Sequence, residues 1–503
     1  MRVAIGVYIR KFTPYLVIII TNIAINSALS LFSVWVSERY SFSVRRRLFE
    51  QVLRTKWQPI STYHSGDLMT RITSDVSSVT SGVIDVLTSV VSLIVQFIVA
   101  FLLLCHYEPQ LSLFVLILGP IAAVASFFFG RKLKKIQVKL QETEAKYRSF
   151  MQENISNVLI VKSFTAEDRM LDELTVLFHE RLKWLRKKNR MAVIMNAVIG
   201  STFALAYLSA LAWGVIKISL GLITYGTLTL FLQLVSQIQG PIIRLSHTIP
   251  TLISIFASAG RINEINTLEQ EERGHESLNA DNMSVSFENV AFAYDHDSIF
   301  NDVSLYINAG ETIAVTGESG IGKTTLIRLI MDFFAPSSGN IHFEAEGQHF
   351  NASAKMRQYI SYVPQGDTLF SGTIRKNILL GNINASDAEI RKVLETVSAT
   401  EFVDALKDGI DTVIGEKGVG LSEGQAQRIA IARALIKKAP LIVFDEATSA
   451  LDEATELRII KRIRELPDSP TCILITHRRE IIPYLDREIV IQDKKASGIE
   501  TVI

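Results

Sequence analysis

Cysteine is nearly absent from this chain of 503 residues, in which only Cys105 and Cys472 occur. Two cysteines so far apart make no disulfide framework, and neither belongs to a CxxC metal-binding pattern. An excess of charge of one sign is also missing, because 52 lysines and arginines balance 51 aspartates and glutamates. The sequence therefore predicts no nucleic-acid partner. No small-residue cleavage site follows the first long apolar run, so no cleavable signal peptide is expected.

Apolar residues, by contrast, are abundant. They make up 48% of the chain, whose mean hydropathy is +0.26. The length alone predicts two to four domains. Most apolar residues lie in the first half, in runs long enough to cross a bilayer as helices: Thr13–Val36, Val86–Cys105, Leu111–Gly130, Ala192–Ile216 and Leu228–Ile249. The sequence thus predicts a multi-pass integral membrane protein.

Basic residues gather in the two long stretches between these runs, 37–82 and 131–191, and the short connections carry almost none. The positive-inside rule places both long stretches in the cytosol. Residues 131–190 contain neither proline nor glycine, which predicts continuous helix. An acidic, polar linker follows at 265–282, so residues 1–264 are expected to form a helical transmembrane domain.

The pattern changes at Met283 to short β-type runs with helical patterns between the later ones. It predicts an α/β domain over 283–503, large enough to bury its own core. The predicted strands are Val285–Tyr294, Val303–Ile307, Thr312–Thr316, Ile360–Val363, Leu441–Phe444, Cys472–Ile475 and Glu488–Ile491.

A phosphate-binding loop opens this domain. Residues Gly317–Thr324 fit the pattern GxxxxGK[ST], between an apolar strand and a helical segment. Glycines let backbone amides approach phosphate oxygens, and the following helix N-terminus favours negative charge. Lys323 is expected to reach the β- and γ-phosphates of ATP, and Thr324 to ligate Mg²⁺. The predicted nucleotide contacts of this segment are Gly317, Ser319, Gly320, Gly322, Lys323, Thr324 and Thr325.

Two carboxylates end a later apolar strand. Asp445 closes the run Leu441–Phe444, where a carboxylate is costly unless it is paired or near a metal. We expect Asp445 to hold Mg²⁺ through water and Glu446 to orient or deprotonate the attacking water. The alternative is a purely structural acid pair at a strand end.

The sequence Leu421–Gln425 reads LSEGQ and lies 20 residues before Asp445. With the phosphate loop and the Asp-Glu pair, it resembles the ATP-binding cassette (ABC) family, in the exporter type with a membrane half fused to one cassette. The resemblance implies that Ser422, Gly424 and Gln425 bind a γ-phosphate. Glu423 departs from the family's usual glycine, and a carboxylate near a triphosphate is not obviously helpful.

The resemblance assigns further roles in the cassette. Tyr294 would stack on adenine, Gln365 would sense Mg²⁺ and the γ-phosphate, and His477 would contact the γ-phosphate. Segment Ser449–Asp452 would link two ATP sites. The corresponding structural alternatives are a core tyrosine, a solvated glutamine, a strand-end histidine and a helix cap.

In the membrane half, Ser61–Gly66 and Ile160–Asp168 resemble the two coupling helices of the family. The family usually has six spans, and its first basic loop follows the second. Here the similar motif Gly66–Arg71 follows only one span, so the first family span is expected to be missing. A misplaced start or a truncation would explain this, and a natural five-span protein is the alternative.

The resulting hypothesis is an ATP-driven exporter half-transporter with ATP and Mg²⁺ as cofactors. It would work as a homodimer or heterodimer with a second half-transporter, contact membrane lipid, and carry a small amphipathic, lipid or peptide substrate. A bacterial cell membrane with the cassette in the cytosol is expected. The alternative is an inactive or regulatory subunit that binds ATP without productive transport. The spans exclude a soluble repair or translation ATPase.

Overall fold

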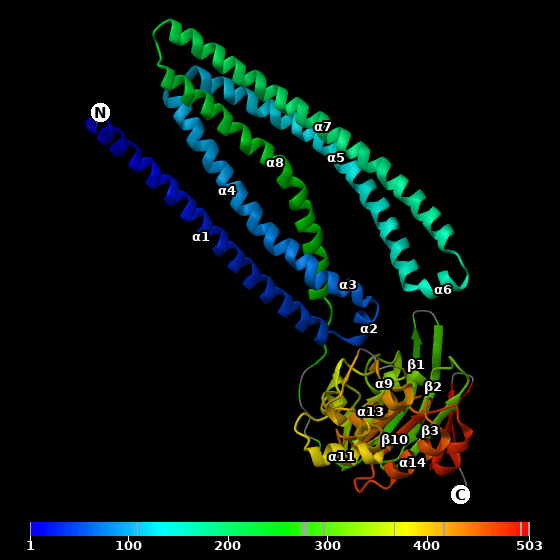
Figure 1. The fold of residues 1–503 in the computed structure, drawn as a ribbon. Helices are drawn as coiled ribbons and strands as arrows, with labels where there is room; N and C mark the ends of the chain where they lie inside the picture. Colours follow the sequence, from blue (N-terminus) through cyan, green and yellow to red (C-terminus); the bar gives the residue numbers. More distant parts are fainter. Residues whose placement is uncertain are drawn as a thin grey trace. The chain divides into compact units, whose positions relative to one another are not determined.

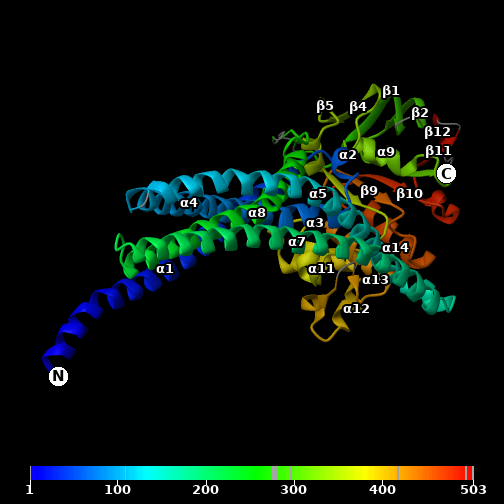
Figure 2. The ribbon, with the colours of Figure 1, turned by 90° about the horizontal axis from the view of Figure 1, so that it is seen from above.

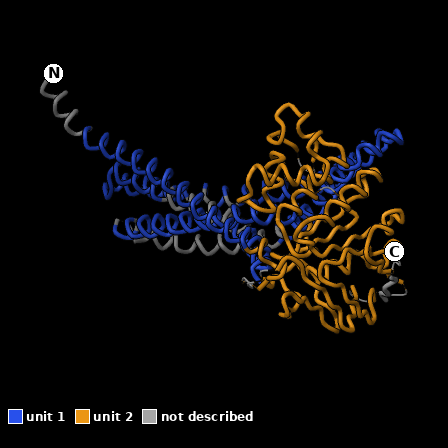
Figure 3. The backbone as a smooth tube through the Cα atoms, turned by 90° about the horizontal axis from the view of Figure 1, so that it is seen from below, with its two compact units in different colours: residues 1–50, 65–267 blue, residues 51–64, 268–503 orange. Residues whose placement is uncertain are grey.

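The computed structural model describes residues 2–500 apart from 108, 273, 275–277, 279, 295–296, 367, 416–417 and 493–494. Side chains at 2–12, 104, 107–131, 134, 199, 203, 206, 235, 237–250 and 495–500 are also outside the description. The chain forms two compact units, one of residues 1–50 and 65–267 and one of residues 51–64 and 268–503 (Figure 3).

The first unit is helical throughout. Its elements are α1 (Arg2–Arg54, whose last residues belong to the second unit), α3 (Ser65–Thr70), the π-helical segment η1 (Arg71–Asp75), α4 (Val76–Tyr107), α5 (Pro109–Ser156), α6 (Val158–Ser163), α7 (Glu167–Ser219) and α8 (Tyr225–Asn266). Within this unit α4 lies along α8, and α5 lies along α7 (Figure 1). The long antiparallel helices follow from apolar runs that no proline-rich or glycine-rich segment interrupts.

Three helical stretches of the described residues are long and apolar enough to cross a membrane: Thr13–Arg54, Ser65–Leu103 and Glu167–Ser219. They contain most or all of three of the five predicted spans. The predicted spans Leu111–Gly130 and Leu228–Ile249 fall on α5 and α8, where most of their side chains lie outside the described residues. On α1, Asn26 Nδ2 donates a hydrogen bond of 2.6 Å to Asn22 Oδ1. One polar atom of each side-chain amide thus has a partner inside the apolar run.

The continuous helix predicted over 131–190 is wrong, because the chain breaks twice. Asn157 leaves helical geometry at φ −111°, and its side-chain amide donates to the carbonyl of Glu153 at 2.9 Å, which satisfies a helix-end acceptor. Thr165 adopts φ +47° before α7 begins. The short helix between the breaks is α6, which overlaps the predicted segment Ile160–Asp168 (Figure 1).

The other predicted coupling segment also differs in position. The short helix near it is α2 (Trp57–Ile60), and Ser61–His64 form a turn before α3. Residues 51–64 belong to the second unit, where the Trp57 ring packs 5.6 Å from the ring of Phe333. The backbone of 54–56 pairs there with 269–271, as Lys56 N donates to Glu269 O at 3.0 Å and Glu271 N to Arg54 O at 2.8 Å.

The second unit is built on a six-stranded sheet of order β12-β11-β3-β10-β9-β6. Its strands are β3 (Thr312–Gly317), β6 (Ile360–Val363), β9 (Leu441–Asp445), β10 (Thr471–Ile475), β11 (Arg487–Gln492) and β12 (Lys495–Glu500). All pair in parallel except β12. Strands β9 and β10 are buried along their whole length, as expected for parallel strands covered on both faces.

A second, antiparallel sheet has the order β2-β1-β4-β5, and these strands lie together in Figure 2. They are β1 (Ser284–Tyr294), β2 (Asp297–Ile307), β4 (Ser338–Ala345) and β5 (Gln348–Asn351). One apolar core packs this sheet and α9 (Lys323–Ile330) on the parallel sheet. A second core lies under α13 (Glu423–Leu435) and α14 (Glu453–Arg464).

Short elements complete the unit: η2 (Ala354–Tyr359), β7 (Gly372–Thr373), α10 (Ile374–Leu379), α11 (Asp387–Thr396), α12 (Thr400–Asp404), η3 (Gly409–Asp411), β8 (Val413–Ile414) and η5 (Arg479–Tyr484). Each of the seven predicted strands is present. Parallel strands bring all their carboxyl ends to one edge of the sheet, so the loops that follow these strands lie close together there.

Candidate active site

The predicted site residues follow the carboxyl ends of adjacent strands. Strand β9 pairs with β10 up to Asp445 and Ile475, and β10 pairs with β3 up to Ile475 and Val315. Strand β6 lies on the other side of β9. The loops after these four strands therefore meet at one edge, which is where α/β sheets bind ligands.

The loop after β3 is shaped by glycine. Gly317, Gly320 and Gly322 have φ of +149°, +81° and +118°, a backbone region that other residues avoid. A Cβ at Gly317 would lie 2.8 Å from the Ile491 carbonyl oxygen, and one at Gly322 would lie 2.6 Å from Ile299 Cγ2. At Gly320 nothing lies within 4 Å, so this side of the loop is open. Helix α9 begins directly after Gly322, as an anion-binding loop requires.

Lys323 lies inside this loop. Its ammonium donates to the carbonyl oxygens of Gly317 at 2.9 Å and Glu318 at 3.0 Å. Burial lowers the pKa of Lys323, and the nearby carboxylates of Glu446 and Asp445 oppose that shift. A cation held this way beside open loop space suits a polyphosphate.

Asp445 is a buried carboxylate with two hydroxyl donors. It is 1% exposed, and it accepts from Thr324 Oγ1 at Oδ1 and from the Tyr362 hydroxyl at Oδ2, each at 3.2 Å. Burial raises the pKa of Asp445, and the two hydrogen bonds lower it. Sequence reasoning missed Tyr362, although a tyrosine in the short strand before Pro364-Gln365 was visible.

This oxygen-only donor set fits Mg²⁺. Asp445 and Thr324 offer one carboxylate and one hydroxyl, and Mg²⁺ typically takes one or two protein oxygens with water and substrate phosphates. Among the described residues, no group of three or more His, Cys, Asp and Glu is placed to hold a metal alone. A metal here would therefore depend on nucleotide oxygens for the rest of its shell.

The three predicted catalytic side chains meet. Gln365 Nε2 donates to Glu446 Oε2 at 2.6 Å, and His477 Nε2 lies 3.1 Å from Glu446 Oε1. Glu446 has φ +51°, an uncommon value for a residue with a side chain and one that often marks functional sites. The arrangement leaves a carboxylate fixed at both oxygens, beside the loop that would hold a phosphate.

Tyr294 packs its ring in the core and places its hydroxyl beside the phosphate loop. Its ring packs edge-to-face on Phe292 at 4.9 Å and Phe334 at 5.2 Å, as a core tyrosine would. Its hydroxyl lies 3.3 Å from Thr325 Oγ1 and accepts from Arg328 Nη1 at 3.3 Å, next to the phosphate loop. Adenine stacking by Tyr294 stays a prediction.

The segment Leu421–Gln425 starts α13. Ser422 is the N-cap residue, and it exchanges hydrogen bonds with Gln425 in a capping box, which fixes the start of the helix. A Cβ at Gly424 would lie 2.9 Å from the Ala450 carbonyl oxygen, so glycine is needed for this contact. Exposed Glu423 stands in the first turn, where a carboxylate stabilises the helix N-terminus.

Comparison with known proteins agrees with this geometry. Residues 9–242 match the ABC transporter transmembrane region and residues 300–449 match the ABC transporter family. An ATP-dependent lipid A-core flippase of Syntrophus aciditrophicus is 31% identical over 465 residues, which cover 91% of this chain and 76% of the relative. The chain is an ABC transporter of the exporter type.

Other relatives agree with that assignment. This exporter is 29% identical to a putative multidrug export ATP-binding/permease protein, YgaD of Bacillus subtilis, over 92% of the chain and 80% of the relative. The solved structure of a bacterial Atm1-family ABC exporter with ATP bound superposes with a TM-score of 0.80 at 25% identity, covering 92% of this chain and 82% of that one. The predicted helical transmembrane domain followed by an α/β cassette is confirmed, and the exporter is a membrane-bound ATPase coupled to transport.

Arg478, which sequence reasoning also missed, organises the segment Ser449–Asp452 of the exporter. Its guanidinium donates to Glu456 Oε2 at 2.6 Å and to the carbonyls of Ser449 at 2.8 Å and Leu451 at 2.7 Å. Asp452 caps α14 by accepting from Thr455 N at 2.9 Å. The helix-cap alternative for this segment is therefore observed, and its predicted role between two ATP sites stays a prediction.

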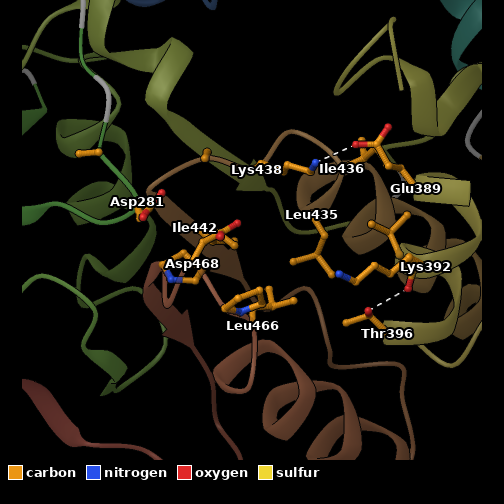
Figure 4. A pocket seen from close by; sticks show the side chains of 15 residues that line it. Asp281, Glu389, Lys392, Thr396, Leu435, Ile436, Lys438, Ile442, Leu466 and Asp468 are labelled. Carbon is orange, nitrogen blue, oxygen red and sulfur yellow. Dashed lines mark hydrogen bonds and ion pairs between the residues drawn. The ribbon is translucent and has the colours of Figure 1, made fainter. Parts of the chain in front are cut away.

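A separate cavity of about 180 Å³ lies in the cassette away from these loops (Figure 4). It lies between α11, the end of α13 and the loop Leu466–Pro470, and the ion pair of Lys438 with Glu389 (2.7 Å) stands at its edge. It shares no residue with the site described above.

Proposed function

We propose that this exporter works with a second half-transporter as a dimer, uses Mg²⁺-ATP, and moves a lipid, drug or other small amphipathic or peptide substrate out across a bacterial cell membrane. The meeting of Glu446, Gln365 and His477 beside the loop of Lys323 and Thr324 carries the proposal. The relatives named as a lipid A-core flippase and a multidrug exporter support the substrate class.

The signature segment supports the dimer. Ser422, Gly424 and Gln425 open a helix fit for a phosphate, yet among the described residues no hydrogen bond or ion pair joins them to Gly317–Thr324 of the same chain. One chain carries one phosphate loop and one signature segment. Two copies, or two related chains, would complete each site by pairing the loop of one with the signature of the other.

The residues divide the work of hydrolysis. Lys323 would neutralise the β- and γ-phosphates, and Asp445 with Thr324 would hold Mg²⁺, which when bound neutralises phosphate charge. Glu446 would accept the proton of the attacking water. Gln365 and His477 contact its two oxygens and hold the carboxylate in place, and both would sense the γ-phosphate.

The regulatory alternative, a subunit that binds ATP without productive transport, gains no support. Loss of a group needed for hydrolysis would be the usual mark of such a subunit in its sequence. Here Lys323, Asp445, Glu446 and His477 are all present. His477 lies 3.1 Å from Glu446, and Lys323 is near enough to both carboxylates to interact with their charges.

The decisive variant is Glu446→Gln in the purified full-length exporter. ATP binding should persist because Lys323 and Thr324 remain, and steady-state ATPase should fall by about 10²-fold or more because the water loses its base. Glu453→Gln, an exposed carboxylate on α14, is the matched control and should hydrolyse at the parent rate.

ATPase of Glu446→Gln within twofold of the parent would refute the assigned base. Transport is tested in parallel by reconstituting the parent into liposomes with a fluorescent lipid, a cationic dye and a hydrophobic peptide. ATP-dependent movement of at least one supports the exporter proposal. Robust ATPase that no substrate stimulates, with none of them moved, would favour the regulatory alternative.

A further inference from the structure

Tyr362 reaches along the sheet to the metal-site carboxylate. Strands β6 and β9 run parallel, with Tyr362 opposite Val443, two residues before Asp445. Two strand residues span roughly 6.6 Å, a distance that a phenol side chain can bridge. The Tyr362 hydroxyl donates to Asp445 Oδ2 at 3.2 Å.

The ring of Tyr362 is held by packing. It lies half-buried against the core formed by β1, β2, β4, α9 and the parallel sheet. A phenylalanine would supply the same apolar surface, so the hydroxyl needs a reason of its own. The hydrogen bond from this hydroxyl to Asp445 Oδ2 supplies that reason.

We propose that Tyr362 is a positioning residue that orients Asp445 for Mg²⁺-ATP. The inference rests on the proposed use of Mg²⁺-ATP. Asp445 has two hydroxyl donors, and Thr324 is itself assigned to Mg²⁺. Tyr362 is the donor with no other assigned task, and groups that orient ligating carboxylates affect metal affinity strongly.

The test measures how much Mg²⁺ strengthens ATP binding. In the full-length exporter carrying Glu446→Gln, ATP affinity is measured with Mg²⁺ and with EDTA, and the ratio is the metal gain. Adding Tyr362→Phe should reduce the metal gain by about tenfold and leave the EDTA affinity unchanged. In the Glu446 parent, the same substitution should raise the Mg²⁺ concentration for half-maximal ATPase by a similar factor and change the saturated rate little.

Tyr359→Phe is the matched control. Tyr359 lies three residues earlier, and its hydroxyl accepts from Leu278 N at 2.9 Å. Its substitution also removes a phenol oxygen, but one that is hydrogen-bonded to a backbone amide. This variant should keep the full metal gain. Thermal unfolding without nucleotide should give similar midpoints for the two phenylalanine variants, which separates a metal effect from a loss of folding.

An unchanged metal gain in Tyr362→Phe would overturn the inference. An equal fold-loss of ATP affinity with Mg²⁺ and with EDTA is one such result, and it would mean that the ring acts through packing alone. A parent protein with no metal gain would instead remove the Mg²⁺ part of the proposed function and the inference with it. The parent measurement thus tells the two failures apart.

Discussion

Lys437 is a half-buried lysine of the cassette whose ammonium lies against backbone carbonyls. Its ammonium donates to Ile360 O at 2.6 Å and Arg357 O at 2.8 Å, and burial lowers its pKa to about 8. The unfolded chain therefore binds more protons than the folded one between pH 8 and the ordinary lysine pKa. Stability should rise with pH across this window, by on the order of 2–3 kcal/mol from this group.

We expect Lys437→Met to remove that rise. The measurement is the thermal midpoint of the detergent-solubilised exporter from pH 7 to 10.5, compared between parent and variant so that other titrating groups cancel. The neighbouring Lys438→Met removes an exposed ammonium paired with Glu389 and should keep the parent slope. Identical pH slopes for parent and Lys437→Met would contradict the prediction.

Glu456 is a fully buried carboxylate that depends on Arg478. It is 0% exposed and accepts from Arg478 Nη1 and Thr448 Oγ1, each at 2.6 Å. Arg478→Leu leaves the buried Glu456 carboxylate without its cationic partner, and it should lower the free energy of unfolding by about 3 kcal/mol. The double variant Glu456→Gln with Arg478→Leu should recover part of the loss in thermal midpoint. Arg479→Leu, at an exposed neighbour, is the control, and a loss there as large as in Arg478→Leu would argue against the pair.

At the scale of elements, an ion pair between a buried carboxylate on η1 and an exposed arginine on α8 joins these two elements. Asp75, 4% exposed, accepts from Arg261 Nε and Ser258 Oγ, both at 2.8 Å. Arg71 Nη1 adds bonds to Arg261 O at 2.9 Å and to Glu264 at 2.6 Å. The π-helical segment η1 carries both Arg71 and Asp75 toward α8, and single π-helical turns often occur at functional positions.

Breaking this pair should loosen the helical unit. Asp75→Asn keeps the size of the side chain and removes the charge that Arg261 faces, so we expect a loss of about 2 kcal/mol in stability. Limited proteolysis and the thermal midpoint of the reconstituted exporter report the change. Asp172→Asn, an exposed acid on α7, serves as control. A midpoint for Asp75→Asn equal to that of the control would show that the pair adds nothing.

The elements also show where sequence patterns suffice. Strands β3, β9 and β10 each contain a run of three or four apolar residues. They were predicted nearly to the residue, as was the loop between β3 and α9. Strand β4 was missed because polar Asn340, His342 and Glu344 alternate with its buried residues and weaken the apolar signal. The breaks around α6 were missed because they depend on the dihedral angles of Asn157 and Thr165, which no Gly or Pro announces.

Long-range contacts set the other limit. The resemblance to ABC exporters supplied the roles of Gln365, Glu446 and His477. Their meeting follows from the strand order, in which β9 lies between β10 and β6. The contacts of Tyr362 with Asp445 and of Arg478 with Glu456 join residues 83 and 22 positions apart. No periodicity within one element encodes such pairs, so they required the folded chain.

At the scale of the whole molecule, the proposed dimer makes a prediction about mixed copies. Lys323→Ala disables the phosphate loop, and Ser422→Arg places a bulky cation at the capping position of the signature helix. If each site combines the loop of one copy with the signature of the other, a mixed dimer has one site with both defects and one with none. A homodimer of either variant has two defective sites.

The two variants are co-expressed with different tags in the Glu446→Gln background, and mixed dimers are isolated by purification on both tags. Occluded ATP should approach the full value in Glu446→Gln dimers, fall to about half in mixed dimers, and be nearly lost in dimers of either variant alone. If each cassette bound ATP by itself, Ser422→Arg dimers would stay fully loaded, because their phosphate loops are intact. Mixed dimers would then also hold half of the full amount of ATP, because one of their two copies lacks Lys323. The Ser422→Arg homodimer therefore distinguishes a composite site from a site within one cassette. Full occlusion of ATP in this homodimer would rule out the composite site, because it would show that the signature segment of one copy does not close over the nucleotide of the other.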